Sequence, residues 1–219
     1  METLQRSETR IYLSQENKWT RNEACIQRVG TVRAHSLPGG FFGFAEVTLL
    51  AGQSWDKPAA QSGINICIPL LGSILLGEGK FMEPGELYQF FTPMGKSITV
   101  ENPHQQDSIH LLWINLPCPN ATSSQLIDFQ LEEDLRHIAQ IEILGTCTNL
   151  NLYLGRILGR NEASIRTHGP SFGFVLSGAF EYQNCLLEHG DGLWIEEGAG
   201  VEMEALSMEG LIMVLEFEE

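Results

Sequence analysis

The chain has 219 residues, and its 28 acidic and 13 basic side chains give a formal net charge of −15 at pH 7. Such a charge repels phosphate backbones and anionic membrane surfaces, so we expect neither a nucleic-acid partner nor a membrane partner. Hydrophobic residues make up 43% of the chain, which is enough for a packed core and excludes a disordered protein. The five cysteines form no C-x-x-C pair and the N-terminus has no signal-peptide pattern, so we expect reduced thiols and a cytoplasmic location.

Glycine and proline are spread along the chain and separate short apolar segments, a pattern typical of an antiparallel all-β fold. In the first half the predicted strands are 10–13, 44–49, 64–70, 87–91, 97–100 and 109–116. In the second half they are 150–154, 173–176, 179–182, 192–195, 201–205 and 211–217. Between the halves, apolar residues at Leu131, Leu135 and Ile138 predict one short helix.

The two halves repeat each other. Gly72 corresponds to Gly178, and Gly85 corresponds to Gly190 at the same offset to within one residue. A stable offset indicates a duplicated structural unit. We therefore predict three parts: N-terminal strands with a first barrel at 1–120, a connecting segment with the short helix at 121–145, and a second barrel at 146–219.

The spacing in both halves resembles the two motifs of the cupin superfamily. In cupins the first motif places His-x-His and Glu between two glycines, and the second places a His after Pro-x-Gly and before Asn. The first half keeps the frame residues Gly52, Gly72, Pro93, Gly95 and Asn102. The second half keeps the frame residues Gly159, Gly178 and Gly198. The resemblance implies two tandem jelly-roll-like barrels, each a double-stranded β-helix.

The four positions that bind a divalent metal in cupins are occupied by other residue types in both halves. The first-half positions are held by Pro58, Ala60, Asn65 and Ile98. The second-half positions are held by Ile165, Thr167, Ser171 and Val201. A metal site needs several imidazole, carboxylate or thiolate donors, and these residues offer none. The resemblance therefore implies that the usual cupin metal is absent, and we expect no cofactor.

The segments 42–47 and 92–95, together with Glu101 and Asn102, narrow the resemblance to the pirin family and its bacterial quercetinase-like branch. Members with the metal ligands are proposed iron-binding regulators or quercetin 2,3-dioxygenases. This resemblance implies a pirin-like bicupin in which dioxygenase activity is in doubt.

Two classes of function stay open. The first, which the missing ligands favour, is a non-catalytic protein that binds a small apolar ligand or a protein partner and exists as a monomer or weak homodimer. The residues at the former metal positions would then line its ligand pockets. The second is an enzyme: a dioxygenase with a single divalent metal such as Fe displaced to His168, or a metal-independent enzyme.

Two histidines, His168 and His110, are candidates for a site. His168 follows Thr167, but the turn His168-Gly169-Pro170 is more simply interpreted as carrying an exposed imidazole. His110 alternates with Leu111 and could face the mouth of the first barrel, although a hydrogen-bonded structural role is the simpler interpretation.

Overall fold

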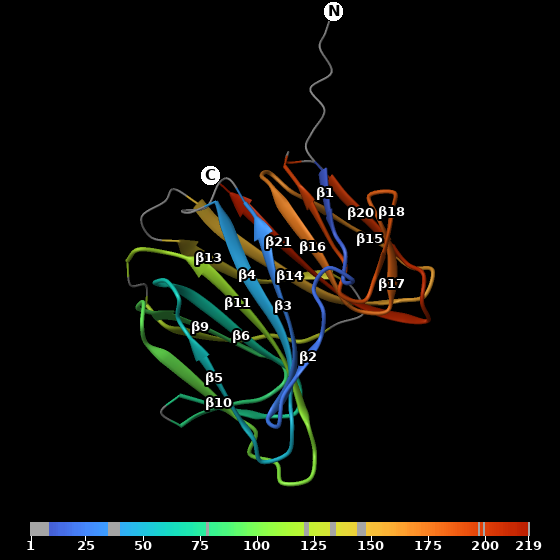
Figure 1. The fold of residues 1–219 in the computed structure, drawn as a ribbon. Helices are drawn as coiled ribbons and strands as arrows, with labels where there is room; N and C mark the ends of the chain where they lie inside the picture. The colour runs from blue at the N-terminus through green and yellow to red at the C-terminus, as the bar shows by residue number, and fades with distance from the viewer. Residues whose placement is uncertain are drawn as a thin grey trace, which may run out of the picture. The chain divides into compact units, whose positions relative to one another are not determined.

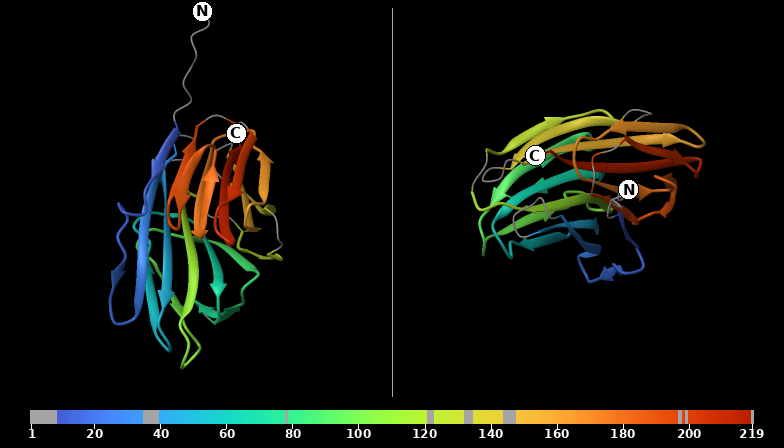
Figure 2. Two further views of the ribbon diagram at one scale, coloured as in Figure 1. Left: turned by 90° about the vertical axis from the view of Figure 1, so that its right-hand side faces the viewer. Right: turned by 90° about the horizontal axis from the view of Figure 1, so that it is seen from above.

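The computed structural model describes residues 9–34, 40–77, 79–120, 123–131, 135–143, 148–196, 198 and 200–218. Every regular element of these residues is a β-strand, so the predicted all-β class is confirmed (Figures 1 and 2). The described residues contain no helix that could cross a membrane. The chain divides into two compact units. Barrel one comprises Asn17–Gln130 and Ile143–Thr146, and barrel two comprises Met1–Glu16, Leu131–Glu142 and Cys147–Glu219.

Barrel one contains a seven-stranded and a four-stranded antiparallel sheet. In spatial order the larger sheet consists of β12 (Gln125–Asp128), β9 (Glu86–Thr92), β6 (Gly63–Leu71), β11 (Ile109–Pro117), β4 (Phe41–Leu49), β3 (Cys25–Arg33) and β2 (Thr20–Arg21). The smaller sheet consists of β5 (Ser54–Pro58), β10 (Ser97–Glu101), β7 (Ile74–Leu76) and β8 (Lys80–Met82). Buried residues of both sheets, such as Trp55 and Trp113, pack into one core.

Barrel two repeats this plan. Its larger sheet consists of β1 (Thr9–Tyr12), β19 (Gly192–Ile195), β16 (Ser171–Ser177), β21 (Glu209–Glu218), β14 (Thr148–Leu158) and β13 (Leu135–Ile143). Its smaller sheet consists of β15 (Glu162–Arg166), β20 (Gly200–Ala205), β17 (Ala179–Tyr182) and β18 (Cys185–Glu188). The order β9-β6-β11-β4 in barrel one matches β19-β16-β21-β14 in barrel two, so the duplication read from the sequence is present in the fold.

The glycines that reveal the repeat are required by the backbone. Gly72 and Gly178 have φ angles of 73° and 81°, and Gly85 and Gly190 have φ angles of 97° and 86°. Side chains other than glycine rarely adopt these left-handed conformations. Each pair therefore marks the same turn in the two barrels.

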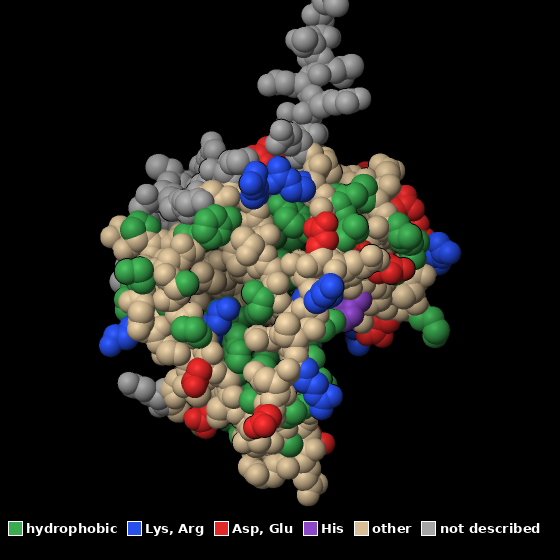
Figure 3. Space-filling model, in the orientation of Figure 1, with side chains coloured by type: hydrophobic (Ala, Val, Ile, Leu, Met, Phe, Trp, Pro, Cys, Tyr) green, Lys and Arg blue, Asp and Glu red, His purple; other side chains and the backbone are tan. Residues whose placement is uncertain are grey.

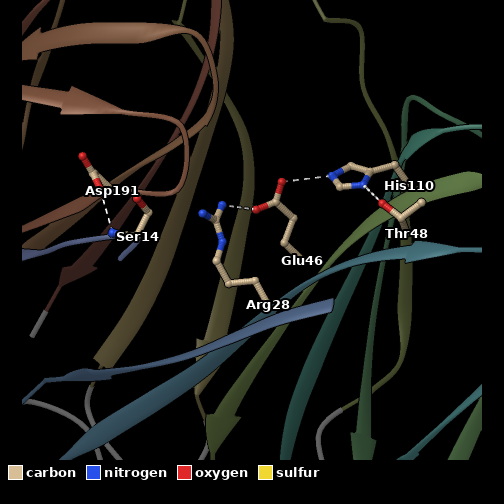
Figure 4. Close-up of polar contacts among 6 residues, drawn as sticks. All are labelled: Ser14, Arg28, Glu46, Thr48, His110 and Asp191. Carbon is tan, nitrogen blue, oxygen red and sulfur yellow. Dashed lines mark hydrogen bonds and ion pairs between the residues drawn. The ribbon is translucent and has the colours of Figure 1, made fainter. Parts of the chain in front are cut away.

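The first strand differs from the predicted division of the chain. That division puts the N-terminal strands with the first barrel, but β1 (Thr9–Tyr12) pairs with β19 of barrel two, from Thr9 opposite Ile195 to Tyr12 opposite Gly192. Asp191 Oδ1 accepts a hydrogen bond of 2.7 Å from the Ser14 backbone nitrogen, which fixes the chain just after β1 (Figure 4). An unpaired sheet edge must be covered, and β1 covers the edge of β19.

The predicted connecting segment 121–145 also differs. Its residues 125–128 form β12, which pairs with β9 at one edge of the larger sheet of barrel one. Strand β9 corresponds to β19 of barrel two, so β12 lies where β1 lies in barrel two. The predicted helix over 131–138 is wrong: Leu135–Ile143 forms strand β13 beside β14, and residues 132–134 lie outside the described residues. From Ala139 to Ile143 the sequence alternates apolar and polar residues, a strand period that outweighs the helical spacing before it.

On the molecular face drawn in Figure 3, charged and apolar side chains are scattered among polar ones. Exposed large apolar residues such as Met94 and Met208 come from separate turns. Single exposed apolar side chains are normal on a protein surface.

Candidate functional site

A cavity of about 180 Å³ lies in barrel one where the cupin frame would hold a metal. All four residues predicted there line it: Pro58, Ala60, Asn65 and Ile98. They come from β5 and the turn after it, from β6 and from β10. The structure thus brings these four positions together around one space.

The strand register changes which residues of β5 face inward. Opposed residues in an antiparallel pair share a face. Trp55 opposes Val100, and both are buried in the core, while Lys57 opposes Ile98. Lys57 therefore lies on the inward face, and Pro58 lies on the outward face opposite Ser97.

The burial pattern continues this alternation. Ala59 is half-buried, whereas Pro58 and Ala60 are exposed even though they line the cavity. The cupin spacing, counted from Gly52 with a fixed loop length, predicts that Pro58 faces inward. In the structure the inward residue is Lys57, one position earlier. Starting from Trp55 as an inward residue, the two-residue period of the strand would have found Lys57.

Asn65 is held by a buried hydrogen-bond network. Its Oδ1 accepts hydrogen bonds of 3.0 Å from both Trp113 Nε1 and Asn115 Nδ2. Its Nδ2 donates a hydrogen bond of 2.9 Å to Thr92 Oγ1. Asn65 is 4% exposed and Thr92 is 3% exposed. Because the amide oxygen already accepts two hydrogen bonds, its role is to position Trp113 and Asn115 at the cavity.

The aromatic ring of Trp113 forms one side of the cavity. Trp113 lines it and packs edge-to-face with Trp55 at 5.6 Å and with Phe90 at 5.5 Å between ring centroids. The Lys57 ammonium lies 5.6 Å from the centroid of the Trp55 ring. Burial lowers the pKa of the Lys57 ammonium. The cavity therefore combines an aromatic wall, amide groups and one amine.

Barrel two places its four predicted residues differently. Ile165 and Val201 oppose each other in β15 and β20, and both belong to the apolar core or pack against it. Thr167 is buried just after β15, and Ser171 is fully buried at the start of β16. Ile165 and Val201 therefore pack within the core at the former metal positions of this barrel.

A buried carboxylate that the sequence motifs do not predict lies beside Ser171. Glu216 is 1% exposed and opposes both Ser171 and Asn151 in the sheet. It accepts hydrogen bonds from Asn151 Nδ2 at 3.2 Å, Tyr153 Oη at 3.0 Å and the His168 backbone nitrogen at 2.5 Å. Burial, followed by the hydrogen bond and charge of Glu216, raises the pKa of Tyr153. In the sequence, this buried carboxylate is marked by the position of Glu216 within the otherwise apolar run 211–217.

The His168 side chain is exposed, and only its backbone takes part in the Glu216 network. Among the described residues, no group of three or more His, Cys, Asp and Glu side chains is arranged to hold a metal ion. The displaced metal at His168 stays a prediction, and metal analysis tests it below.

His110 lies on the sheet face opposite the barrel-one core, to which the neighbouring Leu111 belongs. Its Nε2 is 3.1 Å from Glu46 Oε1 and its Nδ1 is 3.0 Å from Thr48 Oγ1 (Figure 4). Glu46 is fully buried and also pairs with Arg28. The expectation that His110 could face the barrel mouth is therefore wrong, and the imidazole is part of a hydrogen-bonded network.

Solved structures resemble this arrangement over nearly the whole chain. A structure of the bacterial pirin YhhW from Escherichia coli in complex with nickel(II) matches with a TM-score of 0.71 and 12% identity, covering 95% of this chain and 98% of that one. Quercetin 2,3-dioxygenase from Acinetobacter baumannii matches with a TM-score of 0.70 and 14% identity, covering 94% and 84%. The protein YhaK from Escherichia coli matches with a TM-score of 0.67 and 17% identity, covering 96% and 93%.

No protein-family model and no curated protein matches the sequence. At identities below 20% the structural matches establish the fold. The chain has the pirin-like bicupin fold, and the resemblance predicted from the glycine spacing is confirmed at that level.

Proposed function

We propose that this bicupin is a non-catalytic protein that binds a small organic molecule in the cavity of barrel one. The observation that carries the proposal is the cavity of about 180 Å³ at the former metal position, walled by Trp113 and Ile98. An apolar cavity of about 150 Å³ is large enough for benzene, so a ligand of one ring fits this volume. The substituted ligand positions argue against metal chemistry in the same space.

A ligand screen tests the proposal. Trp113 lines the cavity, so a ligand bound there will change tryptophan emission. A ligand at a hundred times its Kd raises the unfolding free energy by about 2.7 kcal/mol, which a thermal-shift assay detects. Small aromatic and aliphatic compounds should produce both signals in the full-length protein.

Two matched variants locate the binding. Ala59 is half-buried at the cavity, whereas Ser97 is exposed on the outward face of β10. Ala59→Leu should abolish both signals, and Ser97→Leu should leave them unchanged. Binding that survives Ala59→Leu would place the ligand elsewhere and contradict the proposal.

The alternative function is a metal-dependent dioxygenase, favoured by the likeness to quercetin 2,3-dioxygenase. Elemental analysis of protein purified without a His tag separates the two. Our proposal expects far less than one metal ion per chain. Stoichiometric iron, nickel, copper or manganese that is lost in His168→Ala, together with turnover of quercetin, would establish the alternative.

A further inference from the structure

Among the described residues that line the barrel-one cavity, Lys57 is the only one with a charged side chain. Across the described residues it forms no hydrogen bond and no ion pair, and its one polar contact is with the face of the Trp55 ring. The chain has 28 acidic and 13 basic side chains, so a cation has many possible carboxylate partners. Lys57 pairs with none of the carboxylates that the structure describes. The inward face of β5 keeps the ammonium away from its neighbour Asp56, which is exposed and hydrogen-bonded to Thr99.

Lys57 is half-buried, and its ammonium has no counter-charge among the residues that the structure describes. Removing a cation from water costs free energy unless an anion or several hydrogen-bond acceptors replace the water. The cation–π contact with Trp55 supplies only part of that compensation. An anionic group entering the cavity would supply the rest, and a neutral ligand would not.

Resting on the small-molecule role proposed for barrel one, we propose that Lys57 makes this cavity a site for a small organic monocarboxylate with a compact apolar body. The carboxylate would pair with the Lys57 ammonium, and the apolar body would lie against Trp113 and Ile98. Asn115 also lines the cavity and uses only one of its two amide hydrogens on Asn65, which leaves one for the ligand.

The charge and volume of the cavity select this class of ligand. A single ammonium balances one negative charge, whereas phosphate groups usually meet Arg forks, several cations or clustered backbone N–H groups. A cavity of about 180 Å³ is smaller than the usual site of a drug-sized ligand. It admits a one-ring acid.

Benzoate and its neutral analogue benzamide test the proposal by isothermal titration calorimetry and tryptophan emission on the full-length protein. The wild-type protein should bind benzoate about tenfold or more tightly than benzamide, because a hydrogen bond between charged groups exceeds a neutral one. Lys57→Met should lose that preference while keeping its melting temperature, and Lys57→Arg should retain it.

Lys80 supplies the matched control. Its ammonium also lies over an aromatic ring of barrel one, 4.4 Å from the Tyr88 centroid, and it does not line the cavity. Lys80→Met should bind benzoate like the wild type. Equal binding of benzoate and benzamide, or a benzoate preference that survives Lys57→Met, would overturn the anion site.

Failure of the two proposals can be distinguished. If benzoate and benzamide bind equally and Ala59→Leu abolishes both, the small-molecule role stands and the anion site fails. If neither probe binds at millimolar concentration and the ligand screen is also empty, both proposals fail.

Discussion

The most exacting test of the barrel-one site is the substitution Asn65→Leu. Asn65 is 4% exposed and satisfies three polar groups: it accepts from Trp113 and Asn115 and donates to Thr92. Leucine has the same branching and the same number of side-chain heavy atoms but no polar atom. The substitution therefore removes the hydrogen bonds while keeping the branched shape of the side chain, and we expect barrel one to become less stable.

The expected loss follows from the surroundings of each partner. Trp113 is 1% exposed, so its N–H cannot reach water, and leaving such a donor unpaired costs about 1–3 kcal/mol. Thr92 loses the hydrogen bond that it accepts, at about 1 kcal/mol, while the half-buried Asn115 can turn to water at the cavity. Burying the leucine returns about 1 kcal/mol. We therefore expect a net loss of about 1–3 kcal/mol.

Urea denaturation followed by tryptophan emission measures this loss, because Trp55 and Trp113 lie in the core of barrel one. Thr92→Val is the matched control: it removes one acceptor and should cost about 1 kcal/mol or less. A loss in Asn65→Leu no larger than in Thr92→Val would refute the reasoning. Asn65 would then not be needed to satisfy Trp113.

Three further outcomes are expected elsewhere in the molecule. Glu216→Leu removes the acceptor of three donors in barrel two, of which the Asn151 amide is buried, so its unfolding free energy should fall by about 1–3 kcal/mol in chemical denaturation; a loss below 1 kcal/mol would mean that the donors find other partners. Gly173→Ala places a methyl group 2.5 Å from Tyr182 Cζ, and its melting temperature should drop by several degrees, corresponding to about 1–3 kcal/mol. Burial raises the pKa of the Cys67 thiol and hides it, so iodoacetamide should modify the half-buried Cys185 before Cys67 under native conditions, as peptide mapping can check. Early labelling of Cys67 would show that barrel one opens readily.

Much of the fold follows from local sequence patterns. The glycines Gly72 and Gly178 need left-handed backbone angles, and the apolar runs around them have strand length, so the repeat could be read without a structure. The pairing partners of short edge strands could not be predicted from the sequence. Thr9–Tyr12 pairs with a strand about 180 residues later, and nothing in four residues specifies that edge.

The candidate site could be located from the sequence, but its inward residues could not be assigned by spacing alone. Spacing from Gly52 identified the region around Pro58 and Ala60, and the structure places both at the cavity. It missed Lys57, because loop length can shift by one residue and every such shift exchanges the two faces of a strand. Glu216 was missed for a different reason: one acid near the end of the apolar run 211–217 does not show by itself whether it is buried, and tertiary packing decides this.

The two barrels share a frame but differ in what fills the former metal position, and this difference decides where function should be sought. In barrel two, Ile165 and Val201 pack in the core, and the buried Glu216 receives three hydrogen bonds from its own chain. In barrel one a cavity remains at the former metal position, and Lys57 faces it without an ionic partner among the described residues. A buried group whose hydrogen bonds are complete contributes to stability, whereas a half-buried cation beside an open cavity gains most when a ligand arrives. Binding is therefore expected in barrel one, and substitutions in the Glu216 network should alter stability without altering ligand affinity.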